Sequence, residues 1–227
     1  MSGDRRVGGL AVGRTDLTVI TSSTPQLAER NDMATLAKPR LPTRTEFVAK
    51  MKPDEIELFD VAVHESGHAV RGLLLGGEIA RAGVYQGLTT GTEGRTRFRQ
   101  PFDRHHISSV AHAGPHAHAS WTHGGRPTLG QVDAVLAGGG CHDMAQIERA
   151  HAMSGGMLTV DKPSEDHLLN RTWPGVLMLA AELYRRGELD HDAVLASLGL
   201  NRESAVMKFA DLRSGGGFRL HQAHTRF

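Results

Sequence analysis

The chain has 227 residues, enough for one well-filled hydrophobic core with at most a small appendage. Its formal net charge is +1, which argues against both a nucleic-acid-binding surface and an acidic scaffold, so no nucleic-acid partner is expected. The single cysteine, Cys141, excludes an internal disulfide and suits a reducing compartment.

Targeting and membrane segments are not apparent in the sequence. Residues 1–21 lack the apolar run of a signal peptide. The longest apolar stretch near the C-terminus, residues 176–183, is too short to cross a bilayer. We therefore expect a cytoplasmic protein without a membrane span.

The N-terminal part of the chain differs in pattern from the part that follows it. Residues 1–45 show no sustained hydrophobic period and predict a flexible N-terminal arm. Pro53 followed by Asp54 and Glu55 is typical of a helix start. Apolar residues then recur at helical spacing until the glycine pair that begins at Gly76, which predicts the strongest helix of the chain.

The following segments predict one pair of strands and several further helices. Residues 78–86 and 94–99 alternate in polarity and predict an antiparallel pair. A helix is predicted over 105–121, where Pro115 should kink or restart it. Later helical patterns cover residues 141–153, 163–186 and 191–199.

These elements predict a fold that is mainly α with a small antiparallel β-hairpin. We expect a compact domain over residues 46–205, followed by a mobile C-terminal tail over residues 206–227. The sequence shows neither an internal repeat nor a heptad pattern, so a solenoid or coiled coil is not expected.

The motif that carries chemistry lies inside the first strong helix and reads His64-Glu65-Ser66-Gly67-His68. Two histidines four residues apart share one face of a helix, so their ring nitrogens can converge on one tetrahedral zinc ion. The glutamate beside the first histidine flanks the metal and can act as a general base toward water. The motif therefore predicts a zinc-dependent hydrolase with His64 and His68 as metal ligands and Glu65 as the catalytic residue.

The simpler interpretation is a pair of histidines on a solvated helix surface. The neighbours of the motif argue against it, because residues 61–63 and 69–70 are all apolar. Burying three polar groups without a partner or a metal would be costly. Ser66 and Gly67 are small enough for another segment to pack closely beside the metal.

A catalytic zinc site usually has three protein ligands and one open position, so the motif leaves one ligand to be found. Asp143, near the start of a helix behind three glycines, is chemically suitable. An acidic residue there can also simply interact with the helix dipole. The alternatives are Cys141 and His142 in the same turn, and, at greater distance in the sequence, Asp133, Glu148, His112 and His123.

The segment Ala62–Val70 resembles the zinc helix of the peptidase domain of FtsH-type ATP-dependent proteases and their stand-alone relatives. Weaker similarities follow in the same order, including the Ala-Gly-rich stretch 111–117 and the turn 140–144, and together they cover about residues 50–200. The resemblance implies a compact helical zinc-peptidase domain with one zinc per chain. It also implies that Asp143 is the third ligand.

The sequence departs from these proteases in its module content. Nothing matches the G-x-x-x-x-G-K-[ST] pattern, so no ATP-driven unfolding module is expected. The resemblance then implies an ATP-independent metallopeptidase that cuts peptides or polypeptides that are already unfolded or extended. The alternative is an inactive or weakly active protein of the same fold that serves as a binding or regulatory module. Glu65 favours the enzyme, because a structural zinc site needs no general base.

Two further groups of residues invite interpretation. Histidines cluster between His105 and His123, and we expect most of them to be solvated rather than to form a second metal site. Arginines alternate along the second predicted strand, at Arg95, Arg97 and Arg99. They could attract acidic peptides or nucleic acid, but such a row is more often a solvated face or an edge protected against aggregation.

Overall fold

The computed structural model describes residues 43–87 and 91–217. These residues belong to one compact unit. The predicted N-terminal arm therefore lies almost entirely outside the described residues, as does the end of the predicted C-terminal tail.

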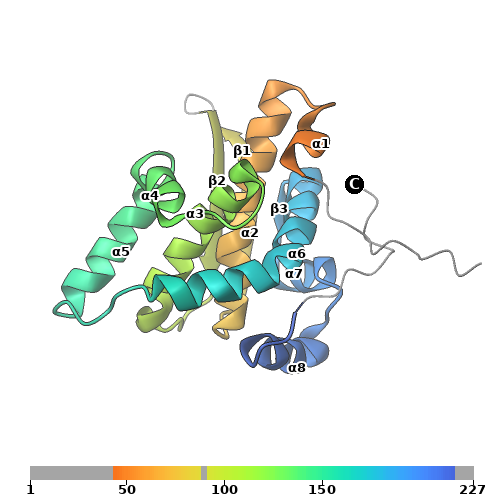
Figure 1. Ribbon diagram of the computed structural model, residues 1–227. Helices are drawn as coiled ribbons and strands as arrows, with labels where there is room; N and C mark the ends of the chain where they lie inside the picture. Colours follow the sequence, from red (N-terminus) through yellow and green to blue (C-terminus); the bar gives the residue numbers. More distant parts are fainter. Residues whose placement is uncertain (1–42, 88–90, 218–227) are drawn as a thin grey trace, which may run out of the picture. The chain divides into compact units, whose positions relative to one another are not determined.

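The described residues form a mainly helical fold with a small antiparallel sheet, as the sequence predicted (Figure 1). In chain order the elements are α1 (Arg44–Val48), α2 (Pro53–Leu74), β1 (Ile79–Gly87), β2 (Gly91–Phe98), η1 (Arg104–His106), α3 (Ile107–His123), α4 (Leu129–Ala137), α5 (Cys141–Met153), α6 (Lys162–Arg186), β3 (Glu188–Leu189), α7 (His191–Ser197) and α8 (Arg202–Arg213). No helix in the described part of the chain is both long and apolar enough to span a membrane.

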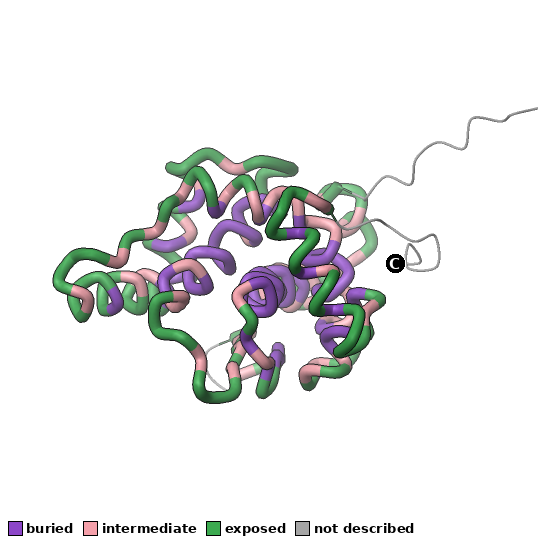
Figure 2. The backbone as a smooth tube through the Cα atoms, turned by 90° about the horizontal axis from the view of Figure 1, so that it is seen from below, coloured by how far each residue is buried: buried purple, intermediate pink, exposed green. Residues whose placement is uncertain are grey.

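Helix α2 is the central element of the fold and begins and ends where the sequence predicts. Pro53 occupies its first turn, and the side chain of Glu55 accepts a hydrogen bond from the backbone N–H of Lys52. The chain leaves the helix through Gly76, whose φ of 82° suits glycine. Because α2 packs against α3, α6 and the sheet, most of its second half is buried. Figure 2 shows the buried segments gathered in the middle of the fold, with exposed segments around them.

The sheet has the strand order β2-β1-β3, and all pairs are antiparallel. In the register of β1 and β2, Arg81 stands opposite Arg97 and Gly83 opposite Arg95. β2 is an edge strand among the described residues, and it also packs against α2. This position brings an open strand edge next to the helix that carries the histidine motif.

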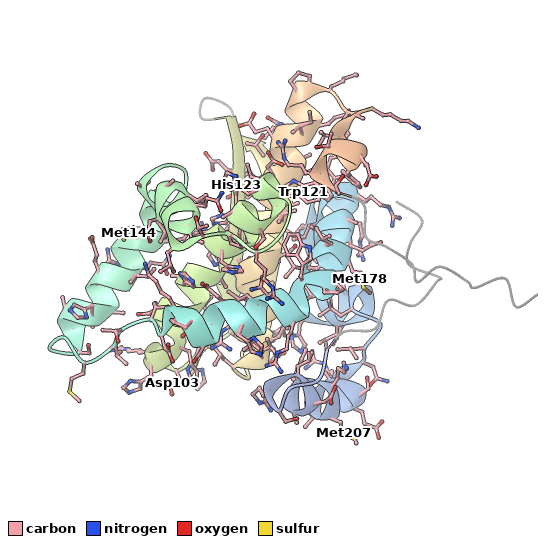
Figure 3. All side chains as sticks on the ribbon, in the orientation of Figure 1. Asp103, Trp121, His123, Met144, Met178 and Met207 are labelled. Atoms are coloured by element: carbon pink, nitrogen blue, oxygen red, sulfur yellow. The ribbon has the colours of Figure 1, made fainter. Side chains whose placement is uncertain are left out.

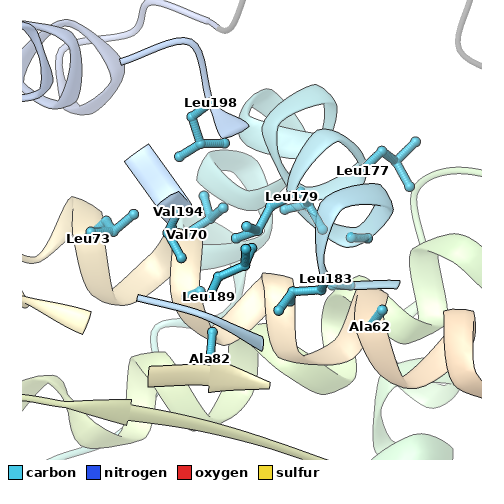
Figure 4. Packing of buried hydrophobic residues seen from close by; sticks show 14 of the residues in the cluster. Ala62, Val70, Leu73, Ala82, Leu177, Leu179, Leu183, Leu189, Val194 and Leu198 are labelled. Carbon is cyan, nitrogen blue, oxygen red and sulfur yellow. The ribbon is translucent and has the colours of Figure 1, made fainter. Parts of the chain in front are cut away.

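The main hydrophobic core lies where α2 meets α6, α7 and the strands β1 and β3 (Figure 4). Val70 and Leu73 of α2 lie there with Leu179 and Leu183 of α6, and Leu189 of β3 joins them. Each of these side chains is essentially removed from water, which contributes about 1.5–3 kcal/mol per large aliphatic residue. The same cluster also includes Ala117 and Trp121 of α3, so α2 is packed by the core on several sides.

A second, smaller hydrophobic cluster joins α3, α4 and α5. Ala119, Val132 and Leu136 are its buried members, and Met144 and Ile147 of α5 pack against them. Figure 3 shows Met144 on α5, away from the core around α6. This cluster fixes α5 against α3, and through it the start of α5 approaches α2.

The structure contains three α-helices that were not predicted from the sequence, α1, α4 and α8, and α1 begins inside the predicted flexible arm. Helix α4 begins at a capping box in which Thr128 and Gln131 bond reciprocally, a signal that is present in the sequence. Helix α8 runs beyond residue 205 and buries Leu212 completely, so ordered structure continues into the predicted tail. In α3, Pro115 lies inside one continuous helix rather than restarting it.

Candidate metal centre

His64 and His68 lie one turn apart on the same face of α2, and their Nε2 atoms are 3.0 Å apart. Both rings are mostly buried, with 14% of the His64 side chain and 10% of the His68 side chain exposed. With Glu65 they form a group whose ligand atoms all lie within 4.8 Å of one another, and this group could hold a metal ion.

Asp143 reaches the two histidines from the first turn of α5. Its Oδ2 lies 3.0 Å from His64 Nε2, and its Oδ1 lies 3.3 Å from His68 Nε2. A tetrahedral ion with bonds of 2.0–2.1 Å has ligand atoms about 3.3 Å apart. The three side chains therefore stand at separations close to those of a tetrahedral metal site.

The tautomer of His68 is set by the backbone of α3. Its Nδ1 lies 2.7 Å from the carbonyl oxygen of Val110, which can only accept a hydrogen bond, so Nδ1 carries the proton. In the neutral ring, Nε2 then presents a lone pair toward His64 and Asp143. A bond of this kind orients a histidine for metal binding and makes the ligating nitrogen more basic.

Two glycines allow α3 to approach the two rings. A Cβ atom on Gly114 would lie 2.3 Å from His68 Nε2 and 2.8 Å from His64 Nε2. A Cβ atom on Gly67 would lie 2.5 Å from the carbonyl oxygen of Ala113, where α2 and α3 cross. The predicted close packing beside the motif is thus present at Gly67. The space beside the ligand nitrogens exists only because residue 114 has no side chain.

The electrostatics of the group couple His68 to Asp143. Burial acts to lower the pKa of His68, but the charge of Asp143 and its hydrogen bond outweigh it and raise the pKa to about 9. Burial acts to raise the pKa of Asp143, yet His68 and His64 hold that pKa well below its usual range. The carboxylate is thus ionised, and a metal ion that binds here would displace the second proton of His68.

Glu65 lies beside the two histidines and is itself buried. The Oγ1 atom of Thr96, on β2, donates a 2.7 Å hydrogen bond to Glu65 Oε2. Gly94, on the same strand, packs so closely that a Cβ atom there would lie 2.5 Å from Glu65 Cγ. The edge strand β2 therefore holds Glu65 in place through its Oε2 atom, and Oε1 is not bonded to Thr96.

The other candidates for a third ligand are placed elsewhere. Cys141 and His142 begin the same helix as Asp143 but are exposed. Asp133 forms an ion pair with Lys162 at 2.8 Å, and Glu148 and His123 are exposed. Of the third-ligand candidates named from the sequence, Asp143 alone is brought within 3.3 Å of both motif histidines in the described part of the chain. Its assignment as a ligand stays a prediction that this geometry favours.

The expectation of a solvated histidine cluster on α3 is wrong for two of its members. His112 and His116 are 0% and 2% exposed, and their Nε2 atoms lie 3.0 and 3.4 Å from Asp166 Oδ1 on α6. Asp166 supplies the polar partner that makes their burial possible. The sequence pattern of α3 alone does not reveal this partner, which lies 54 residues away from His112.

Several residues of the site escaped the sequence analysis. Thr96, Gly94 and Gly114 contact the motif only through tertiary packing. Small residues alternating with arginine on β2 were the available signal for Gly94 and Thr96. For Gly114, the signal was its position within an alanine-rich helix.

No protein-family model matches the chain. No curated protein matches it either.

Proposed function

We propose that this chain is a zinc-dependent metallopeptidase that holds one zinc ion on His64, His68 and Asp143 and uses Glu65 as its general base. In this proposal it is a stand-alone relative of FtsH-type peptidase domains and works without ATP. The convergence of two imidazole nitrogens and one carboxylate, at mutual distances of 3.0–3.3 Å beside a buried glutamate, carries the proposal.

The donor set suits zinc. Two imidazoles and a carboxylate are ligands that zinc accepts readily, and three ligands leave one coordination position open, as in catalytic sites. The side chain of His64 remains 14% exposed, so the centre is not sealed from solvent. A purely structural zinc site, by contrast, is usually closed by four protein ligands.

A bound zinc ion would supply Lewis acidity toward a peptide carbonyl and lower the pKa of water. The residues of the chain would do the rest. Glu65 accepts the proton of the attacking water and passes it to the leaving amine. Thr96 keeps one oxygen of Glu65 engaged, which restrains the carboxylate beside the two histidines. The bond from His68 to Val110 keeps Nε2 directed at the same point.

The position of β2 supports extended polypeptide as the substrate. Its outer edge has no strand neighbour among the described residues, so its backbone groups can pair with an added strand. The same strand contacts Glu65 through Thr96 and Gly94. A peptide bound along this edge would run past the general base with its backbone exposed to attack. A folded protein could not offer such a strand without local unfolding.

The test combines metal content with one conservative substitution. We expect about one zinc per chain in the purified protein, and cleavage of an unfolded substrate such as casein. Glu65→Gln should retain zinc and lose cleavage by at least about 100-fold, because only the proton acceptor is removed. Asp54→Asn is the matched control, since Asp54 is an exposed residue in the first turn of the same helix. Bound zinc with equal cleavage by the wild type and Glu65→Gln would sink the catalytic role.

A further inference from the structure

The face of β2 that points away from α2 carries arginine side chains. Thr96 faces Glu65, and Gly94 packs against Glu65 as well. Because neighbouring residues of a strand point to opposite faces, Arg95 and Arg97 project from the other face, where both are exposed. These two arginines thus lie on the edge strand that contacts the proposed general base, on its solvent side.

Neither arginine is neutralised within the described part of the chain. Arg97 stands opposite Arg81 on β1, whose guanidinium already forms a 3.0 Å ion pair with Glu188. Arg95 stands opposite Gly83, which has no side chain to offer. Arg95 and Arg97 take part in no ion pair among the residues that the structure describes. Glu93 lies on the same face two residues before Arg95. Like charges opposite each other on a sheet are unfavourable, so the part of the face around Arg81 and Arg97 attracts negative charge.

The spacing of these arginines matches that of an added strand. Residues two apart on a strand are about 6.6–6.8 Å apart, and neighbouring strands lie about 4.8 Å from each other. A peptide paired with the edge of β2 would therefore place two of its side chains, at alternate positions, beside Arg95 and Arg97. Carboxylates at those positions would meet guanidinium groups at cross-strand distance.

We propose that Arg95 and Arg97 make the site selective for extended peptides with acidic side chains at alternate positions. This selectivity rests on the proposed peptidase function, since the peptide is the substrate that passes Glu65. A protein partner is favoured over nucleic acid for two reasons. The patch lies on an open strand edge that offers backbone hydrogen bonds to a peptide, and the chain as a whole carries a net charge of only +1.

Binding can be measured separately from cleavage. The zinc-loaded Glu65→Gln variant is titrated with fluorescent octapeptides that differ only in having Glu, Gln or Lys at alternate positions. Each exposed ion pair strengthens binding by roughly two- to fivefold, so the Glu peptide should bind about tenfold more tightly than the Gln peptide. This advantage should shrink at 0.5 M salt, because screening weakens exposed charge pairs.

Charge reversal tests the assignment to these two residues. Introducing Arg95→Glu and Arg97→Glu together should make the Lys peptide the tightest ligand. In a protein that keeps Glu65, the same two substitutions should make the Lys peptide the preferred substrate for cleavage. The control variant carries Arg126→Glu and Arg186→Glu, which change the net charge by the same amount at exposed positions outside the sheet. It should still bind the Glu peptide most tightly, then the Gln peptide, then the Lys peptide. Circular dichroism confirms that each variant is folded.

The outcomes separate this inference from the proposed function. Equal affinities for the three peptides, or the same order in the Arg95/Arg97 variant, would overturn the selectivity and leave only an edge protected against aggregation. A single-stranded oligonucleotide that binds more tightly than the Glu peptide, and loses binding in that variant, would also overturn it. Selective binding of the Glu peptide without any cleavage by the wild type would support the acidic-peptide site and refute the peptidase.

Discussion

Gly114→Ala tests whether the space between α3 and the two histidines is the metal site. The added Cβ atom would lie 2.3 Å from His68 Nε2, 2.4 Å from His68 Cε1 and 2.8 Å from His64 Nε2. Relief of these contacts requires both rings to move by about 1 Å, whereas metal–ligand distances tolerate about 0.2 Å. The substitution should therefore weaken zinc binding by about 100-fold, the upper end of the effect of disturbing ligand orientation.

The substitution should also change the free energy of unfolding of the protein. Overpacking in a buried contact costs about 1–3 kcal/mol, offset in part by up to about 1 kcal/mol from replacing glycine by alanine inside a helix. Zinc at 100 times the wild-type Kd stabilises the wild type by about 2.7 kcal/mol. A variant with 100-fold weaker binding gains only about 0.4 kcal/mol at the same concentration. The difference between wild type and Gly114→Ala should thus widen by about 2.3 kcal/mol on addition of zinc.

Urea unfolding with and without zinc, together with a chelator competition for Kd, measures both quantities. Gly130→Ala is the control, because no atom lies within 4 Å of the position of its added Cβ, and it also lies in a helix. It should bind zinc like the wild type and unfold at an equal or slightly higher urea concentration. A Gly114→Ala protein with the wild-type zinc Kd would refute the assignment of the metal to this space.

Three further predictions address the third ligand, the orientation of the base and the buried histidine pair. Asp143→Asn should weaken zinc binding by at least about tenfold in the chelator competition, whereas Asp133→Asn, on an exposed residue, should not change it. Thr96→Val should lower kcat for peptide cleavage by about tenfold with zinc content maintained. Thr96→Ser should keep the wild-type kcat, because serine retains the hydroxyl that bonds Glu65. Equal kcat in Thr96→Val and the wild type would contradict the positioning role. Burial lowers the pKa of His116 from 6.5 to about 4, so its imidazole binds a proton more tightly in the unfolded chain than in the folded protein. The free energy of unfolding should therefore fall as the pH drops from 6.5 to 4. At pH 5 the loss should be about 2 kcal/mol. Urea titrations of the wild type and His116→Asn should show this slope in the wild type only, and parallel pH dependence in both would disprove the cause.

The sequence alone determined the main helix and the central residues of the candidate site. Apolar residues at helical spacing, a proline start and a glycine stop are local signals, and the structure confirms the helix as α2. His64, Glu65 and His68 fall on one helix, so their proximity follows from helix geometry. The mainly helical fold with a small antiparallel sheet was predictable for the same reason, since the periodicities of helices and strands are properties of short segments.

Contacts between distant segments were decided only by the tertiary structure. Asp143 lies 79 residues from His64, and nothing local to either residue distinguishes it from Cys141 or His142 as a partner. The burial of His112 and His116 depends on Asp166 in another helix, so the sequence pattern of α3 predicted solvated histidines instead. Thr96 and Gly114 belong to the site because β2 and α3 pack against α2, and that packing follows from how the whole core excludes water.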